Sequence, residues 1–153
     1  MQKIASFTIN HDVLVPGLYV SRVDGDVITY DLRMRTPNKG SYLSTASAHT
    51  LEHLFATYVR SSKRSGQIVY VGPMGCRTGF YFLVRDGISK GEVIALLRET
   101  FAFIKGFEGE IPGARRMECG NYLDHDLQQA KKDAAAFEEV LFDWTAEKMA
   151  YPV

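Results

Sequence analysis

Residues 47–64, SAHTLEHLFATYVRSSKR, carry apolar side chains at a spacing that predicts an amphipathic helix. The apolar positions that recur at helical spacing are Leu51, Leu54, Phe55, Tyr58 and Val59. Ser47 is the expected N-cap, because a serine hydroxyl accepts a hydrogen bond from the first turn of a helix. The helix should therefore bury one face in a core and leave its polar face available for another purpose.

The polar face of this helix carries His49, Glu52 and His53, which share one side because residues i, i+3 and i+4 are neighbours on a helix. Two histidines at i and i+4 can bind one metal ion through their imidazole nitrogens. The alternative is a solvated helix face. The chain has only four histidines, and two of them flank a carboxylate at ligand spacing, so the pattern favours a metal site.

The chain has two cysteines, Cys76 and Cys119, and such a pair in a reducing compartment is more often catalytic or metal-bound than disulfide-linked. Cys119 follows a loop rich in glycine and proline, and its thiolate would suit a borderline divalent ion as a third ligand. The alternative is a small buried apolar residue. Cys76 lies beside Arg77, whose charge favours the thiolate of an acid, base or nucleophile, and the alternative is an inert turn cysteine. His125 has either an outer-shell role at the metal or, as its position favours, a capping or surface role.

Outward from the helix, the rest of the chain predicts a sheet and two more helices. Strands are expected at residues 17–23 and 26–34, around an Asp24-Gly25 turn, and at residues 67–72 and 78–86. A capping box, Ser89 with Glu92, begins the second helix, and the last helix is expected at residues 125–149. These elements show no regular βαβ alternation. The expected fold class is therefore α+β, with a mostly antiparallel sheet packed against helices, in a single domain over residues 1–153.

The second strand alternates apolar and polar side chains. Ile28, Tyr30, Leu32 and Met34 share one face, and the other face carries Thr29, Asp31 and Arg33. Arg33 is therefore expected on the side away from the apolar set.

Composition narrows the functional classes. The 18 basic and 18 acidic residues give a net charge of zero, which argues against nucleic acid as the main partner. The basic stretch 60–64 is interpreted as a solvated helix end rather than a binding patch. The sequence has no apolar run long enough to cross a membrane and no signal peptide at its N-terminus, so the expected location is cytoplasmic.

Several stretches together resemble the S-ribosylhomocysteine lyase (LuxS) family. In chain order they are Ser6-Phe7 with His11, Asp31-Leu32-Arg33, Thr36-Pro37-Asn38-Lys39, residues 49–54 (HTLEHL), residues 73–81 (PMGCRTGFY) and residues 118–121 (ECGN). The HTLEH stretch alone is modestly specific, but combined with PMGCRTG and the later Cys-Gly it is highly specific. The chain departs from the family at Tyr70-Val71-Gly72, where relatives commonly carry an acidic, serine-bearing segment.

The resemblance implies a homodimeric enzyme with two active sites at the subunit interface and a LuxS/metallopeptidase-like α/β sandwich fold. It implies cleavage of S-ribosylhomocysteine to homocysteine and 4,5-dihydroxy-2,3-pentanedione, the precursor of the quorum-sensing signal autoinducer-2. The implied metal is Fe²⁺, replaceable by Zn²⁺ or Co²⁺. The residues that carry over are His49, His53 and Cys119 as metal ligands, Cys76 and Glu52 as the acid/base pair, and Ser6, His11, Arg33 and Arg60 as substrate contacts.

Two other functions remain open on the residues alone. The pattern H-x-x-E-H is also that of inverzincin metallopeptidases, although those chains are generally longer and use a carboxylate as third ligand. A metal-binding domain without turnover is the other alternative. Arg60 likewise has a simpler interpretation as a surface charge at a helix end.

Overall fold

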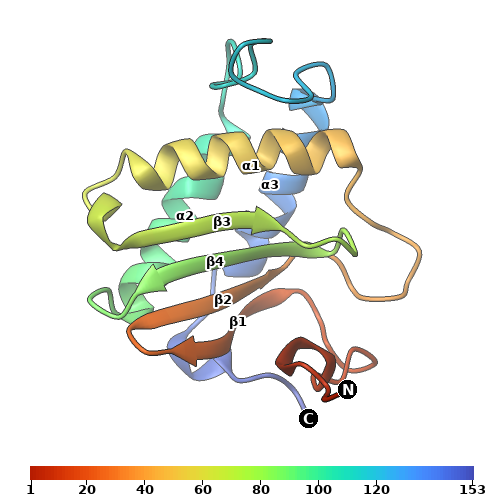
Figure 1. Cartoon of the computed structure of the whole chain (residues 1–153), viewed down its shortest axis with the longest axis vertical. Coiled ribbons are helices and arrows are strands. Elements are labelled where there is room, and N and C mark those ends of the chain that lie inside the picture. The colour runs from red at the N-terminus through yellow and green to blue at the C-terminus, as the bar shows by residue number, and fades with distance from the viewer.

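The computed structural model describes all residues 1–153 and has one four-stranded antiparallel sheet with the order β1-β2-β4-β3 (Figure 1). The strands are β1 (Gly17–Asp24), β2 (Val27–Arg33), β3 (Ile68–Pro73) and β4 (Gly79–Arg85). The α-helices are α1 (Thr45–Arg60), α2 (Lys90–Lys105) and α3 (Leu127–Leu141), with short 3-10 helices η1 (Ala5–Phe7), η2 (Ser65–Gln67) and η3 (Ala146–Met149). The expected α+β class and antiparallel sheet are confirmed.

Two tight hairpins set the register of the sheet. The β1–β2 turn places Gly25 at a φ of 60°, a backbone conformation that glycine adopts without a steric penalty. At the other hairpin, Gly79 pairs with Arg33 of β2, and a side chain at this glycine would bring a Cβ atom within 2.0 Å of the Leu32 carbonyl oxygen. Glycine therefore permits the close approach of β4 to β2 beside the Cys76 loop.

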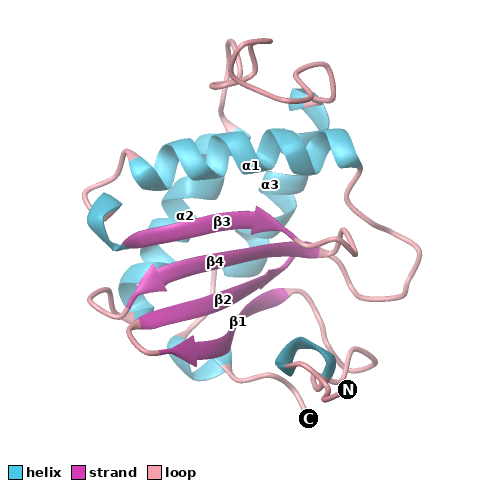
Figure 2. Ribbon diagram, in the orientation of Figure 1, coloured by secondary structure: helices cyan, strands magenta, loops and turns pink.

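The helices cover one face of the sheet, and the core lies between the two layers (Figure 2). Every second side chain along the strands points into this core, where it packs against the apolar faces of the three α-helices. The fully buried members include Leu18, Tyr30, Leu32, Leu51, Phe55, Phe80, Phe82, Leu97, Phe101 and Phe137. No helix of the structure combines the length and the apolar character that a membrane crossing needs.

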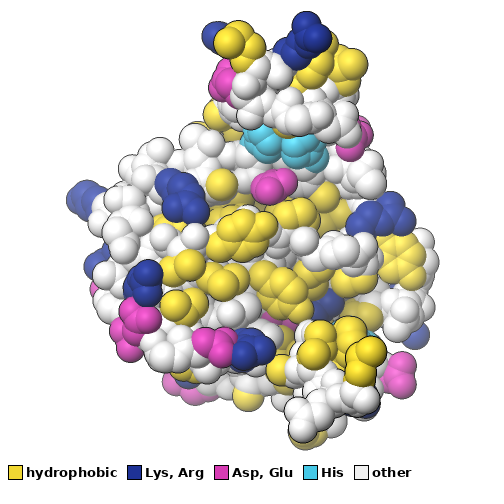
Figure 3. Space-filling view, viewed as in Figure 1, with side chains coloured by type: hydrophobic (Ala, Val, Ile, Leu, Met, Phe, Trp, Pro, Cys, Tyr) yellow, Lys and Arg dark blue, Asp and Glu magenta, His cyan; other side chains and the backbone are white.

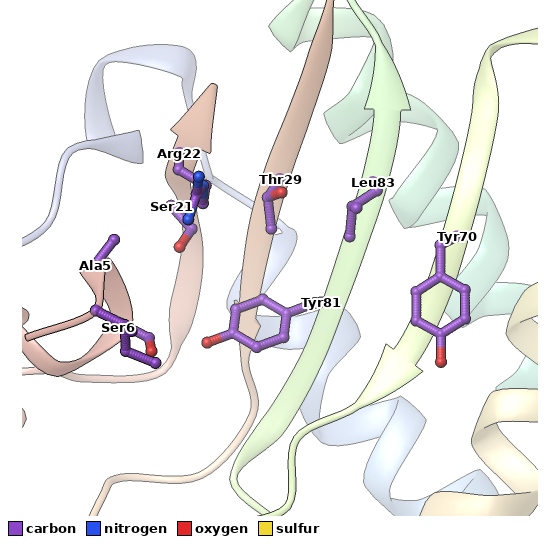
Figure 4. Close-up of a pocket in the computed structure, with 9 residues that line it drawn as sticks. Ala5, Ser6, Ser21, Arg22, Thr29, Tyr70, Tyr81 and Leu83 are labelled. Atoms are coloured by element: carbon purple, nitrogen blue, oxygen red, sulfur yellow. The ribbon is translucent and has the colours of Figure 1, made fainter. Parts of the chain in front are cut away.

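The other face of the sheet carries no helix and presents apolar side chains at the front of Figure 3. A shallow pocket on this face is lined by Tyr70, Tyr81, Leu83 and Thr29 from the strands and by the N-terminal segment with Ser6 (Figure 4). In Figure 4, Ser6 and Tyr81 lie toward β1, and Tyr70 stands at the β3 end. Exposed apolar area of this kind marks an interaction surface more often than a solvated one.

The predicted N-cap of the first helix was wrong. Ser44, three residues earlier, caps α1 by accepting a hydrogen bond from the Ser47 amide. Ser47 is fully buried inside the first turn, and its hydroxyl bonds the carboxylate of Asp133 on α3. A contact across the fold therefore uses the side chain that local sequence assigned to the cap.

The predicted last helix was too long, because α3 ends at Leu141. Arg98 of α2 donates hydrogen bonds to the carbonyl oxygens of Leu141, Phe142 and Trp144, which satisfies backbone acceptors in the turn that follows the helix. Trp144 leaves the helix and donates its indole N–H to the Leu18 carbonyl on β1. The C-terminal residues then continue past β1 instead of extending the helix (Figure 1).

Candidate metal centre and active site

Two histidines of α1 and one cysteine of the 106–126 loop meet at a single point. His49 and His53 lie one turn apart on the helix, and the loop, which rises above α1 at the top of Figure 1, brings Cys119 to them. The side-chain donor atoms of these residues and of His125 all lie within 4.8 Å of one another. All four residues are half-buried, and histidine atoms are visible beneath the loop in Figure 3.

The distances in this cluster match those of ligands around one ion. The Nε2 atoms of His49 and His53 lie 3.1 Å apart, and the Cys119 sulfur lies 3.3 Å from His49 Nε2 and 3.9 Å from His53 Nε2. Tetrahedral coordination at ordinary zinc bond lengths requires about 3.4 Å between two nitrogens and about 3.6 Å between nitrogen and sulfur. The spacing of the three side chains thus fits one ion.

The hydrogen bonds behind the histidines show why a cation fits here. His49 Nδ1 lies 2.8 Å from the Asp124 carbonyl oxygen, and His53 Nδ1 lies 2.8 Å from the Pro112 carbonyl oxygen. A carbonyl only accepts, so each Nδ1 carries the proton and each neutral ring turns an Nε2 lone pair toward the other. Two lone pairs at 3.1 Å beside a cysteine sulfur repel one another, and either a proton on one nitrogen or a cation between them removes that repulsion. The donor set therefore fits a divalent metal ion.

His125 adjoins the two histidines and Cys119, and its contacts favour a supporting role over a ligand role. Its ring stacks on His49 with 3.9 Å between centroids and 21° between planes, and its Nδ1 lies 2.9 Å from the Thr50 hydroxyl. Its Nε2 is buried and has no hydrogen-bond partner, whereas the stacking on His49 and the bond to Thr50 hold the ring beside the three donors. Desolvation, followed by electrostatic repulsion from the neighbouring His49 and His53 imidazoles when they are protonated, lowers the pKa of His125, which favours its neutral form.

Glu52 completes the ionisable face of α1. It lies between the two histidines in sequence, is half-buried, and shares their side of the helix. A carboxylate in this position can carry protons to and from a molecule held at the metal.

Cys76 lies in a different depression, on the β3–β4 loop. This depression is lined by His11, Pro37, Asn38, Tyr42, Cys76 and Thr78, and none of the metal-cluster residues contributes to it. The Cys76 thiol is exposed, and its sulfur lies 3.0 Å from the Thr78 hydroxyl oxygen. Within one chain, the Cys76 thiol therefore lies apart from the metal cluster.

Arg33 connects this depression to a buried carboxylate. The guanidinium is 2% exposed and donates to the fully buried Asp31, from Nη2 at 2.6 Å and from Nε at 3.1 Å. Its Nη1 donates to the Thr78 hydroxyl at 2.8 Å. Desolvation by burial opposes the charged guanidinium, but the charge and hydrogen bonds of Asp31, together with the charge of Cys76, outweigh it and raise the pKa of Arg33. Arg33 is on the face opposite the apolar set, as expected, but it is not solvated.

The remaining predicted substrate contacts are distributed over the molecule. His11 lines the Cys76 depression and its Nδ1 bonds the Ile9 carbonyl, whereas Ser6 lines the pocket on the open face of the sheet. Arg60 is exposed at the end of α1 and donates to the Val69 carbonyl of β3. One chain therefore brings His11, Arg33 and Cys76 together and leaves Ser6 and Arg60 apart from them.

Tyr70 and Gly72, in the segment where the sequence departs from the expected family pattern, are in contact on β3. The Tyr70 side chain is 52% exposed and lies across Gly72, where a Cβ atom would come within 2.5 Å of the tyrosine ring. Glycine at position 72 is therefore what lets the ring lie flat on β3. The result is an exposed aromatic surface on β3.

Four residues around these sites were not singled out from the sequence: Asp31, Thr50, Thr78 and Tyr151. Asp31 and Arg33 share a strand face at a spacing of two, so their pairing was accessible from the strand period. Thr78 and Thr50 carry no local signal. Tyr151 is joined to Asp31 by a hydrogen bond that spans 120 positions, which no local pattern indicates.

Comparisons with known proteins agree with this geometry. The family model described as S-Ribosylhomocysteinase (LuxS) matches residues 4–148. The S-ribosylhomocysteine lyases of Clostridium acetobutylicum and Clostridium beijerinckii are 46% and 47% identical to the chain, each covering 99% of the chain and 99% of the relative. The S-ribosylhomocysteine lyase of Phocaeicola vulgatus is 46% identical over 99% of the chain and 98% of the relative.

Proposed function

The chain belongs to the S-ribosylhomocysteinase (LuxS) family, and from this premise we propose that it cleaves S-ribosylhomocysteine to homocysteine and 4,5-dihydroxy-2,3-pentanedione. The observation that carries the proposal is the cluster of two histidines and one cysteine, with Glu52 beside it and a free thiol on a neighbouring loop. A cysteine as the third donor also speaks against the metallopeptidase alternative, whose third ligand is normally a carboxylate. The diketone product would then be the precursor of the signal autoinducer-2.

We propose that His49, His53 and Cys119 hold a divalent ion, with ferrous iron as the native metal. When bound, such an ion supplies Lewis acidity toward the carbonyl and hydroxyl oxygens of the opened sugar. A mixed nitrogen and thiolate donor set suits iron, zinc and cobalt. The two free thiols fit a reducing compartment, and we place the reaction in the cytoplasm.

Cys76 and Glu52 are the proposed proton carriers. Moving a carbonyl along a sugar requires a proton to leave the carbon next to it and a proton to return to the former carbonyl carbon. When the carbonyl reaches the third carbon, removal of the proton at the fourth carbon breaks the bond between the fifth carbon and sulfur, and the homocysteine sulfur takes up a proton. A thiolate and a carboxylate approaching the sugar from different sides can divide these transfers.

Substrate recognition is assigned to Ser6, His11, Arg33 and Arg60. His11 lines the Cys76 depression, Arg33 is linked to it through Thr78, and both are proposed to help orient the sugar beside the thiol. Arg60 can bind a carboxylate such as that of the homocysteine moiety, because a guanidinium forms paired hydrogen bonds with it. Ser6 supplies a hydroxyl at the edge of the open-face pocket.

We propose that the enzyme is a homodimer whose open sheet faces meet. The support is twofold: this face exposes apolar side chains, and the Cys76 depression shares no residue with the metal cluster of the same chain. A second chain would bring the two parts of the site together at the interface and would bury Tyr70, Tyr81 and Leu83.

Leu83→Arg is expected to convert such a dimer into monomers and to abolish activity. An unpaired guanidinium at an apolar interface costs at least about 3 kcal/mol, or about a hundredfold in the dissociation constant. Sedimentation velocity and homocysteine release would be measured on the same preparation. Phe142→Arg is the matched control, because Phe142 is 83% exposed just after α3, and the variant should behave as the wild type. A Leu83→Arg protein that stays dimeric and active would contradict this interface.

The activity itself is tested by homocysteine release from S-ribosylhomocysteine, followed with a thiol reagent. Iron-loaded protein prepared without oxygen is expected to release one thiol per substrate consumed, and chelator-stripped protein is expected to release none. Reloading with Zn²⁺ or Co²⁺ should restore release. A metal-loaded protein that leaves the substrate intact but hydrolyses peptides would replace this function with the peptidase one.

A further inference from the structure

We propose that Tyr151, in the C-terminal tail, is a positioning residue for Cys76 and acts through Asp31, Arg33 and Thr78. The inference rests on the proposed role of Cys76 and extends it to a residue outside the pocket that contains the thiol. The tail passes β1 after η3 and places Tyr151 against the open face of the sheet. There its ring stacks on Tyr19 with 5.1 Å between centroids and 24° between planes.

A chain of hydrogen bonds leads from this tyrosine to the thiol. The Tyr151 hydroxyl donates to Asp31 Oδ2 at 2.7 Å, the same oxygen that accepts from Arg33 Nη2 at 2.6 Å. Arg33 Nη1 donates to the Thr78 hydroxyl at 2.8 Å. Since this hydroxyl oxygen accepts from Arg33, its own proton is free to point at the Cys76 sulfur, 3.0 Å away.

Tyr151 and Arg33 both donate to Asp31, and on the other side Arg33 and then Thr78 donate toward the sulfur, an arrangement that favours negative charge on sulfur. Asp31 is fully buried and accepts from both Arg33 and Tyr151. The negative charge of the Asp31 carboxylate is therefore stabilised by the tyrosine hydroxyl as well as by the guanidinium. Desolvation, followed by the charge of Asp31, raises the pKa of Tyr151, and its hydroxyl therefore stays a donor. Without that donor, Asp31 would draw Arg33 closer to itself and weaken the hydrogen bond from Arg33 to Thr78. The Cys76 thiolate would then lose part of its stabilisation.

Tyr151→Phe removes the hydroxyl and keeps the stacked ring. The readout is the second-order rate of alkylation of Cys76 by iodoacetamide at neutral pH, in metal-loaded protein without substrate, resolved from Cys119 by peptide mass spectrometry. The expected rate is about threefold to tenfold below that of the wild type, the partial loss of a hydrogen bond to a charged group. The kcat for homocysteine release should fall by a similar factor.

Tyr19→Phe is the matched control. Its hydroxyl belongs to the same aromatic stack but donates to the Val15 carbonyl at 2.8 Å, outside the chain that leads to Cys76. The control should lose similar thermal stability and alkylate at the wild-type rate. Equal alkylation rates in the two variants would overturn the proposal and reduce Tyr151 to a structural contact. Because alkylation needs no substrate, this outcome is separate from any failure to observe lyase activity.

Discussion

Cys76→Ala and Glu52→Gln are each expected to lower homocysteine release by about 10²- to 10⁴-fold, the usual contribution of one positioned acid or base. Both substitutions remove a proton carrier and leave the donor atoms of the metal cluster in place. Release from S-ribosylhomocysteine and metal content would be measured on the same samples. A variant that keeps its metal and loses turnover identifies a proton-transfer role, whereas near wild-type release by either variant would remove that residue from the mechanism.

Mixing the two inactive variants gives a sharper result. The depression that contains Cys76 shares no residue with the metal cluster of the same chain, so a dimeric site would draw its thiol from one protomer and Glu52 from the other. A mixed dimer then holds one intact site and one doubly altered site. Random exchange of protomers in a twofold dimer should restore about a quarter of the wild-type activity. Mixtures that stay inactive after verified exchange would place both residues in one chain.

Local chemistry accounts for most of the fold. The hairpin at Gly25 and the capping box at Ser89 are confirmed, because each depends on residues within a few positions of one another. The two errors have a different origin. Ser47 is buried against Asp133, 86 positions away, and the end of α3 is determined by hydrogen bonds from Arg98. Contacts between distant segments override local preference at both places.

The residues of the candidate site also fall into two groups, those that local sequence predicts and those that depend on contacts between distant segments. The two histidines and Glu52 follow from helix periodicity, which places them on one face whatever the rest of the chain does. Whether Cys119 joins them depends on the course of the 106–126 loop, and its sequence alone left a buried apolar role equally open. The structure brings its sulfur to the two imidazoles. The link from Tyr151 to the Cys76 loop depends on where the tail docks, which no periodic pattern encodes.

Cys119→Ala is expected to leave the protein folded and unable to retain a stoichiometric metal ion. The remaining donors are two neutral imidazoles on one helix, and the lost thiolate is the only anionic donor among the three. Metal per chain would be measured by elemental analysis after gel filtration. In the cobalt-loaded protein, the thiolate-to-metal absorption band should disappear as well. An Ala variant that holds one ion through the same filtration would move the third ligand elsewhere.

The His125→Phe variant tests whether His125 is a metal ligand or a ring that supports His49. Phenylalanine can stack on His49 as the histidine does, but it has no nitrogen for a metal and cannot bond the Thr50 hydroxyl. Because His125 is held by its stacking on His49 and its bond to Thr50, this variant should still bind one ion per chain, with affinity about tenfold weaker, the lower end for an outer-shell change. The cobalt band of Cys119 should persist. If His125→Phe lost the metal as completely as Cys119→Ala, the imidazole would have to turn away from His49 on binding, and the cluster would be a closed four-ligand site without a position for substrate.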